Sequence, residues 1–375
     1  MFKDRVFRAA LLLLLCIAGQ GACADIVVGQ VAPLSGLDVN QGRAYSAGMQ
    51  AYFDLVNRSG GIHGRSIALV VRDDAGRADE TVAATRKLLA ESKPVVLAGY
   101  FGARNLAELA KSGLLETDRI ALVGYRTSEV QPDSALLYNV RAGLKDELEK
   151  IAEHLGTVAV TRLALLYEEG PGSAEMIAAM EDAVARNKSR LVATAGYEAG
   201  STRVSAAVTK FMAANPQAVV VVASGSAAAA FIEQYRTAGG SAMLFANSAA
   251  DVEQLSRRLG DEQLQGVAIA QVTPSPYRVS SRIAKELVDL AAKNPDLTQH
   301  MSFATIEGFI AAKVIVEAMR RAGSRTLTRE AFISGLNSLD RLDLGGYAVS
   351  YRGGNRTGSR FVELSIVSST GRIRQ

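Results

Sequence analysis

The sequence has no tryptophan, eight prolines and two cysteines among its 375 residues, and aromatic residues make up 6% of it. So few cysteines exclude a small domain held together by disulfides, and so little proline excludes a collagen-like chain. Hydrophobic residues make up 48% of the chain and charged residues 21%, a balance that excludes intrinsic disorder. At about 100 to 200 residues per domain, the length predicts two domains with sizeable cores.

The chain also lacks an excess of charge of one sign. Its 42 Lys and Arg residues nearly balance its 38 Asp and Glu residues, which gives a formal net charge of +4. A surface for nucleic acid or for a charged membrane needs a larger imbalance. We therefore expect a soluble protein with no nucleic-acid partner.

Residues 1–24 have the pattern of a secretory signal peptide. Basic residues near the start precede a ten-residue apolar run at 9–18, and Ala22-Cys23-Ala24 is a small-residue cleavage pattern. Two alternatives stay open, namely a transmembrane helix, which needs about 20 apolar residues, and lipid attachment at Cys23. We expect export with cleavage after Ala24.

Cleavage at that point removes 24 of the 375 residues and leaves 351. It removes both cysteines, Cys16 and Cys23, and lowers the net charge from +4 to +2 because three basic residues and one acidic residue are lost. No later stretch approaches 18 apolar residues in a row, so we expect no transmembrane helix in the mature chain. A mature chain without disulfides is held by core burial.

Short β-branched or aliphatic runs alternate with amphipathic stretches along the first two thirds of the chain. The runs predict buried parallel strands at 26–32, 66–72, 94–98, 120–124, 163–167, 191–197 and 218–223. The amphipathic stretches predict helices at 43–57, 80–91, 105–115, 145–155, 174–187, 204–214 and 227–238. This alternation predicts an α/β fold of two lobes, each with a parallel sheet covered by helices on both faces.

The alternation ends after residue 272. Thr273-Pro274-Ser275-Pro276 breaks the pattern, and two long helices are predicted after it, at 279–292 and 302–322. Helices left over after a second βα set suggest that the chain returns to the first lobe.

The sequence lacks the common signatures of enzymes. It has no G-x-S-x-G elbow, no G-x-G-x-x-G after a strand and no Walker lysine loop. Its three histidines are isolated from one another, and Asp73-Asp74 at a strand end favours a turn or a helix cap over metal binding. We therefore expect no catalytic residues, no metal site and no cofactor.

Two glycine-rich loops stand out because of their position. Residues 99–105 and 124–128 leave adjacent predicted strands, at the edge where parallel α/β sheets form ligand sites. Backbone N–H groups at a helix start can bind an anion, and Arg126 and Thr127 could complete such a site around a carboxylate. A solvated turn is the alternative for each loop.

Several segments together resemble a known family. They are 29–36, Gly42, 57–61, Gly64, Asp73-Asp74, 87–89, Val140-Arg141 and 163–168. Their order and spacing resemble the type I periplasmic binding proteins of leucine/isoleucine/valine-type ABC importers. This resemblance implies two Rossmann-like lobes joined by a three-crossover hinge that closes over a ligand. It divides the mature chain into an N-terminal lobe (25–141 and 274–358) and a C-terminal lobe (142–273 and 359–375).

The resemblance also implies a location, partners and site residues. It implies a non-enzymatic periplasmic protein that delivers a small ligand to an ABC permease in the inner membrane. The family's ligand-contacting positions fall on Gln41, Phe101, Gly102, Ala103, Tyr125, Arg126, Thr127, Glu169, Ser224, Ser226 and Ser248. A sensory binding protein that presents its closed form to a membrane receptor is the alternative, and an exported enzyme is a remote third.

The ligand itself stays open between an amino acid and an organic acid. Gly102-Ala103 replaces serines that hold an α-carboxylate in relatives, and the partner for an α-ammonium is not evident, with Asp251 and Glu169 as candidates. Arg104 and Arg126 stand where small polar residues are usual, which favours an organic acid stacked on Phe101 and Tyr125.

Overall fold

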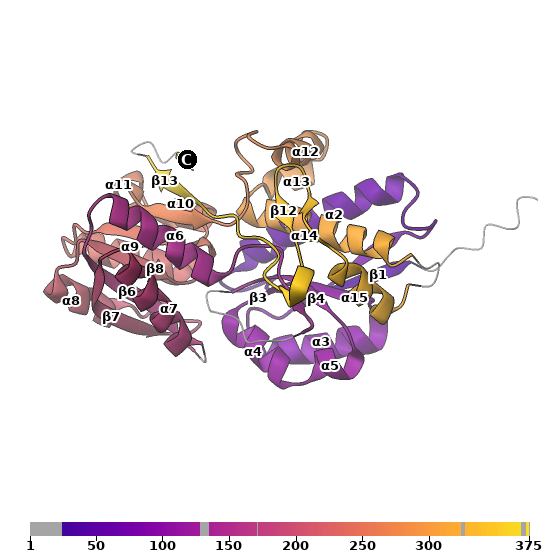
Figure 1. Cartoon of the computed structure of the whole chain (residues 1–375), viewed down its shortest axis with the longest axis horizontal. Helices are drawn as coiled ribbons and strands as arrows, with labels where there is room; N and C mark the ends of the chain where they lie inside the picture. The colour runs from indigo at the N-terminus through magenta and orange to yellow at the C-terminus, as the bar shows by residue number, and fades with distance from the viewer. Residues whose placement is uncertain (1–24, 128–134, 171, 324–326, 369–372, 375) are drawn as a thin grey trace, which may run out of the picture.

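The protein is described from a computed structural model that covers residues 25–127, 135–170, 172–323, 327–368 and 373–374. Two β-sheets, each flanked by helices, lie side by side along the long axis of the molecule (Figure 1). The predicted α/β architecture of two lobes with parallel-stranded sheets is confirmed. The predicted signal peptide lies outside the described residues.

The first sheet contains five parallel strands. In spatial order they are β2 (Ile67–Asp73), β1 (Ile26–Ala32), β3 (Val96–Phe101), β4 (Leu122–Arg126) and β5 (Leu137–Tyr138). Every residue of β3 and β4 is buried, as expected for central strands that are covered on both faces. The strand order reverses between β1 and β3, and such a switch point opens a crevice at the carboxyl ends of the strands.

Four helices connect these strands. They are α2 (Val39–Arg58), α3 (Ala78–Ser92), α4 (Ala103–Lys111) and α5 (Leu114–Asp118). The predicted helix at 105–115 is therefore two helices. Gly113, with φ at +66°, lies between them in a left-handed conformation that an α-helix cannot contain.

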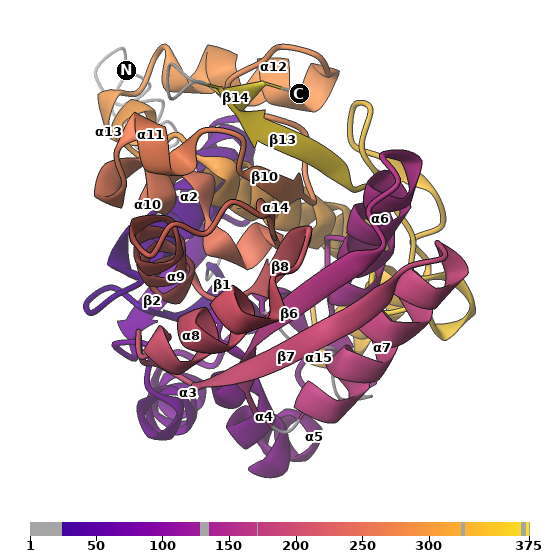
Figure 2. The ribbon, with the colours of Figure 1, turned by 90° about the vertical axis from the view of Figure 1, so that its left-hand side faces the viewer.

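The second sheet contains seven strands and faces the viewer in Figure 2. In spatial order they are β14 (Ile373–Arg374), β13 (Glu363–Val367), β10 (Ala268–Gln271), β9 (Met243–Ala246), β8 (Ala218–Val222), β6 (Arg162–Glu169) and β7 (Arg190–Glu198). β13 and β14 are antiparallel additions at one edge, and the other strands are parallel. The order reverses between β6 and β8, which gives this lobe its own switch point.

The helices of the second lobe cover both faces of its sheet. They are α6 (Leu144–Thr157), α7 (Ser173–Arg186), α8 (Ser205–Ala214), α9 (Gly225–Thr237), the 3-10 turn η1 (Ser248–Ala250), α10 (Val252–Arg258) and α11 (Asp261–Leu264). α6 and α7 pack on one face, and α8, α9 and α10 pack on the other.

After β10 the chain returns to the first lobe, as the sequence predicts. The returning elements are α12 (Arg282–Ala291), α13 (Pro295–Gln299), α14 (Phe303–Arg321), α15 (Arg329–Asn337), the hairpin of β11 (Leu342–Asp343) and β12 (Ala348–Val349), and η2 (Arg352–Gly354). The apolar side chains of α12, α14 and α15 share one core with those of β1 and α2. None of the helices in the described ranges combines the length and apolarity that crossing a membrane requires.

The chain passes between the two lobes three times, after β5, after β10 and before β13. The proposed lobe boundaries at 141/142, 273/274 and 358/359 fall in these connections. Two tyrosines of the returning segment link them: Tyr347 Oη lies 2.9 Å from the carbonyl oxygens of both Val140 and Val272, and Tyr351 Oη donates to Asn139 O at 2.7 Å. The three connections therefore lie together and form one hinge region.

Candidate functional site

A cavity of about 940 Å³ lies between the two lobes at the carboxyl ends of their strands. Its walls come from the segments that follow β1, β2, β3 and β4 in the first lobe and β6, β7, β8 and β9 in the second. Both switch points therefore open into the same cavity. This is where open parallel sheets place ligands.

The loop after β3 brings a helix start to the cavity wall. Gly102 begins α4 with φ at +88°, and Gly102 N donates to Arg126 O at 2.8 Å. The N-cap residue Gly102 has no side chain with which to cap α4, which leaves the first N–H groups of the helix available to solvent or a ligand. This arrangement can favour an anionic group at the α4 end of the cavity.

A chain of hydrogen bonds joins Asp74 to the start of α4. Asp74 Oδ2 accepts a hydrogen bond from Thr81 Oγ1 at 2.6 Å, and Thr81 Oγ1 accepts one from Asn105 Nδ2 at 2.8 Å. The other oxygen of Asp74 accepts the N–H of Gly76 at 2.9 Å. Asp74 therefore organises a turn and the first turn of α4, as the sequence predicts.

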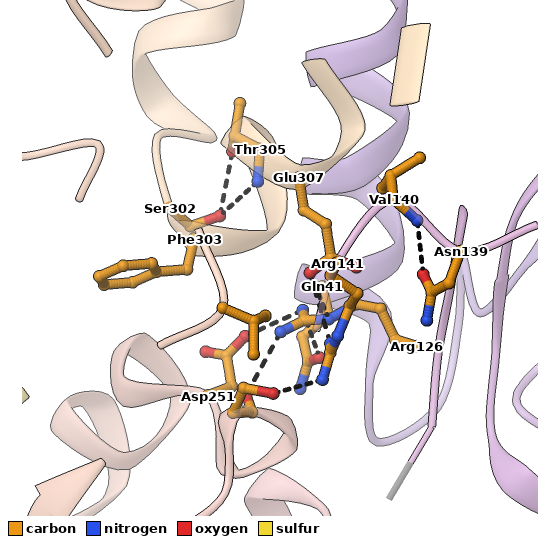
Figure 3. A network of polar contacts seen from close by, with 12 residues as sticks. Gln41, Arg126, Asn139, Val140, Arg141, Asp251, Ser302, Phe303, Thr305 and Glu307 are labelled. Carbon is orange, nitrogen blue, oxygen red and sulfur yellow. Dashed lines mark hydrogen bonds and ion pairs between the residues drawn. The ribbon is translucent and has the colours of Figure 1, made fainter. Parts of the chain in front are cut away.

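Arg126 lines the cavity, but two carboxylates already lie beside its guanidinium (Figure 3). Its Nε is 3.3 Å from Glu307 Oε2, and its Nη1 is 3.6 Å from Asp251 Oδ2. The same Nη1 donates to Gln41 Oε1 at 2.8 Å. Because Asp251 belongs to the second lobe and Glu307 to the first, Arg126 joins the two lobes and has little capacity left for a ligand carboxylate.

A second buried arginine extends this network behind Arg126. Arg141 Nη2 donates to Glu147 Oε1 at 3.0 Å, and Arg141 Nη1 is 3.5 Å from Glu307 Oε2. Ser248 bonds to both Arg141 and Glu147. Glu147 Oε2 accepts the backbone N–H of Ser248 at 2.7 Å, and Arg141 donates to the Ser248 hydroxyl. We name the side chains of Gln41, Arg126, Arg141, Glu147, Ser248, Asp251 and Glu307 the interlobe network.

A neutral contact crosses the cleft beside this network. Gln41 Nε2 donates to Gln254 Oε1 at 3.0 Å, and Gln254 Nε2 donates to Ser226 Oγ at 2.8 Å. These amides join α2 of the first lobe to α10 and α9 of the second. The structure therefore has the lobes in contact at the inner end of the cleft.

Seven of the eleven predicted site residues line the cavity. They are Gln41, Phe101, Gly102, Ala103, Arg126, Thr127 and Ser224. The other four lie elsewhere: Ser226 and Ser248 are buried in the contacts just described, Tyr125 is packed in the first lobe's core, and Glu169 is exposed. A side chain placed on Gly196 of β7 would meet Glu169 within 2.4 Å, so Glu169 lies over β7 and not over the cavity.

The structure adds two acidic residues that the sequence reasoning missed. Glu168 lines the cavity, where the sequence predicts Glu169. Adjacent residues of a strand point to opposite faces of the sheet, so the two side chains cannot both face the cavity. Asp38, just after the first strand, also lines the cavity. Two sequence arguments would have found these residues. Side chains alternate between the two faces of a strand, which separates Glu168 from Glu169 at the end of β6. Ligand sites form where the strand order reverses, which points to the segment after β1 that contains Asp38.

Burial shifts the pKa values of both carboxyl groups. Burial, together with the charge of Asp251, raises the pKa of Asp38 to about 6. Burial also raises the pKa of Glu168, while a hydrogen bond from Tyr197 Oη at 2.8 Å and the charge of Arg104 lower it. Burial therefore disfavours the ionised form of Asp38, and the charge of Arg126 offsets this effect only in part.

Asp251, a sequence candidate for binding an ammonium group, is already occupied. Its Oδ1 caps α10 by accepting from Gln254 N at 2.8 Å, and its Oδ2 faces Arg126. Within the described ranges, no three His, Cys, Asp or Glu side chains gather in a way that could hold a metal ion.

Comparison with known proteins agrees with this geometry. Residues 25–370 match the family model described as periplasmic binding protein. A substrate-binding periplasmic protein from Ralstonia solanacearum is 34% identical, with a TM-score of 0.86 over 93% of this chain and 99% of that one. An amino acid binding protein from Pseudomonas aeruginosa is 22% identical over 83% of this chain and 85% of its own length.

A Leu/Ile/Val-binding protein homologue from Brucella suis is likewise 22% identical, over 95% of this chain and 91% of its own length. The family consists of solute-binding proteins that are not enzymes. The family resemblance and the type I fold expected from the sequence are confirmed. The chain belongs to the periplasmic binding protein family, and relatives named Leu/Ile/Val-binding proteins are among those that it is similar to.

Proposed function

We propose that this protein is the periplasmic substrate-binding component of an ABC importer, which clamps a small carboxylate-bearing ligand between its lobes and delivers it to a permease in the inner membrane. The export signal and cleavage after Ala24 belong to this proposal. The observation that carries it is the cavity shared by two switch points, because a ligand bound there contacts both lobes and favours their closed arrangement.

The size and the walls of the cavity fit a small polar ligand. Its volume of about 940 Å³ is at the upper end of the usual range for ligand pockets. Phe101 supplies an apolar surface, and Thr127 and Ser224 come from opposite lobes. The relative from Pseudomonas aeruginosa is named an amino acid binding protein, which supports a small polar ligand.

The α4 end of the cavity is where we place the carboxylate. Arg126 is held by Asp251 and Glu307, so the uncapped start of α4 and the exposed Arg104 beside it are the better anion partners. Arg104 is at the second position of α4 and lines the cavity. An anion there also gains from the positive end of the helix.

Calorimetry with matched pairs tests this proposal. We expect at least one small amino or organic acid to bind with micromolar affinity, about −8.2 kcal/mol, and its primary amide to bind at least about tenfold more weakly, since the amide lacks the charge. Arg104→Ala is expected to weaken binding of the acid by a similar factor. Lys87→Ala on α3, which removes an exposed charge outside the cavity, is the control. Equal affinity for the acid and its amide would contradict the carboxylate assignment.

A further inference from the structure

Asp38 is a half-buried residue whose carboxyl group lacks the hydrogen bonds that its position would normally give it. It stands directly before α2, where an aspartate commonly accepts a hydrogen bond from the N–H groups of the first turn. Here its side chain makes no capping bond. Its Oδ1 is buried and has no hydrogen-bond partner among the described residues, although Asp38 lines the cavity. An unsatisfied buried carboxylate is costly, so this arrangement requires an explanation.

Glu168 faces the same cavity from the second lobe. It accepts the Tyr197 hydroxyl at 2.8 Å, and Tyr197 Oη in turn accepts Ser224 N at 3.2 Å, so the carboxylate is fixed in position. The negative charge of Glu168 contributes to the raised pKa of Asp38, and the charge of Arg126 opposes this shift. The cavity wall therefore contains a carboxyl group from each lobe.

Among the described residues, no ion pair of 4 Å or less joins a cation of the cavity wall to Asp38 or Glu168, although the charges of Arg126 and Arg104 lower the pKa values of Asp38 and Glu168, respectively. Arg77 is paired with Asp79 and Glu80, Lys111 with Glu108, and Arg126 with Asp251 and Glu307. Arg104 affects Glu168 through its charge alone, and no ion pair of 4 Å or less is found between them in the described parts of the chain. Asp38 and Glu168 are therefore the two carboxyl groups in the described cavity wall that have no ion-pair partner.

We propose that Asp38 and Glu168 together bind a cationic nitrogen of the ligand, an ammonium or guanidinium group remote from its carboxylate. This inference rests on the proposed function and narrows it to a basic ligand. A cation bound there contacts a carboxylate of each lobe, so it stabilises the closed arrangement more than the open one. It also supplies the partner that Asp38 Oδ1 lacks.

An apolar or purely anionic ligand would leave the two carboxylates uncompensated. Closing the lobes over such a ligand would remove water from Asp38 and Glu168 without replacing its hydrogen bonds, which is unfavourable for charged groups. The ligand is therefore expected to resemble L-lysine or 5-aminopentanoate, each of which has a terminal nitrogen as well as a carboxylate. A ligand with an aliphatic end is disfavoured.

Calorimetry at pH 8 with matched probes tests the inference. L-lysine is compared with L-norleucine, and 5-aminopentanoate with pentanoate, because the members of each pair differ by the terminal ammonium. We expect the ammonium-bearing member of at least one pair to bind at least about tenfold more tightly. Asp38→Asn and Glu168→Gln are each expected to weaken its binding at least about tenfold. The control is Asp54→Asn, 16 residues further along α2 and about 24 Å away.

A second measurement separates a binding role from a folding role. Because burial and the charge of Asp251 disfavour ionised Asp38, Asp38→Asn is expected to raise the melting temperature of the protein at pH 8 when no ligand is added. A lowered melting temperature would show that Asp38 stabilises the fold, and would overturn the inference. Norleucine or pentanoate binding as tightly as its ammonium-bearing partner would overturn it while leaving the proposed function standing. Failure of every probe, acids and amino acids of all charges included, would count against both.

Discussion

Replacing Arg141 by methionine is expected to lower the free energy of unfolding by about 3–5 kcal/mol, the usual cost of breaking a buried ion pair. Arg141 is 2% exposed, and its two carboxylate partners, Glu147 and Glu307, are 0% and 1% exposed. Methionine fills much of the same volume but leaves both carboxylates without this cation. Arg126 cannot replace it at Glu147, since Arg126 contacts Glu307 and Asp251.

Urea denaturation followed by circular dichroism measures this loss, since the chain has no tryptophan to report by fluorescence. Arg203→Met is the matched control, because the Arg203 side chain is 75% exposed and its partner, Glu198, is exposed as well. Exposed pairs contribute about 1 kcal/mol or less. A loss for Arg141→Met no larger than that of the control would show that the interlobe network does not stabilise the protein.

A second large effect is expected at Gly308, where α14 crosses α2. A Cβ atom at this position would lie 2.1 Å from the backbone oxygen of Tyr45, and one at Gly48 would lie 2.0 Å from the backbone oxygen of Thr305. Neither oxygen can move unless the helices separate. Gly308→Ala is therefore expected to destabilise the protein by about 3 kcal/mol, although alanine is the better helix former by about 1 kcal/mol.

The consequence of Gly308→Ala should extend to ligand binding. α2 carries Gln41 and α14 carries Glu307, so separating the helices would displace both contacts of Arg126 in the first lobe. Gly260→Ala is the control, since its φ is −70° and a Cβ there meets no atom within 4 Å. Its effect on stability is expected to stay below about 1 kcal/mol. Equal stability of the two variants would contradict the packing described for α2 and α14.

The α/β alternation was predictable because the central strands are continuous apolar runs and the long helices have an amphipathic period. The strand predicted at 26–32 is β1 with the same ends, and the helix predicted at 302–322 is α14 with one residue fewer at each end. The break at Gly113 was missed because a single glycine also occurs inside helices. Its left-handed conformation depends on the tertiary structure around it.

The site was only partly predictable, because its chemistry depends on residues that meet from both lobes. The loops at 99–105 and 124–128 were located by the switch-point rule, but no local pattern shows that Arg126 meets Asp251 from the second lobe. Glu307 did carry a signal, since it stands between Ile306 and Phe309 on the apolar face of α14. An ionisable residue among buried apolar neighbours indicates a buried partner.

The distance between the lobes in solution tests the central claim, that a ligand in the shared cavity closes the two lobes. The chain from residue 25 onward has no cysteine, so spin labels can be placed specifically at Lys87→Cys on α3 and Arg203→Cys before α8. Both side chains are exposed and lie on different lobes. Pulsed electron paramagnetic resonance with the tightest binder from the calorimetric panel is predicted to show a shorter and narrower distance distribution than the ligand-free protein. An unchanged distribution at saturating ligand would contradict the account.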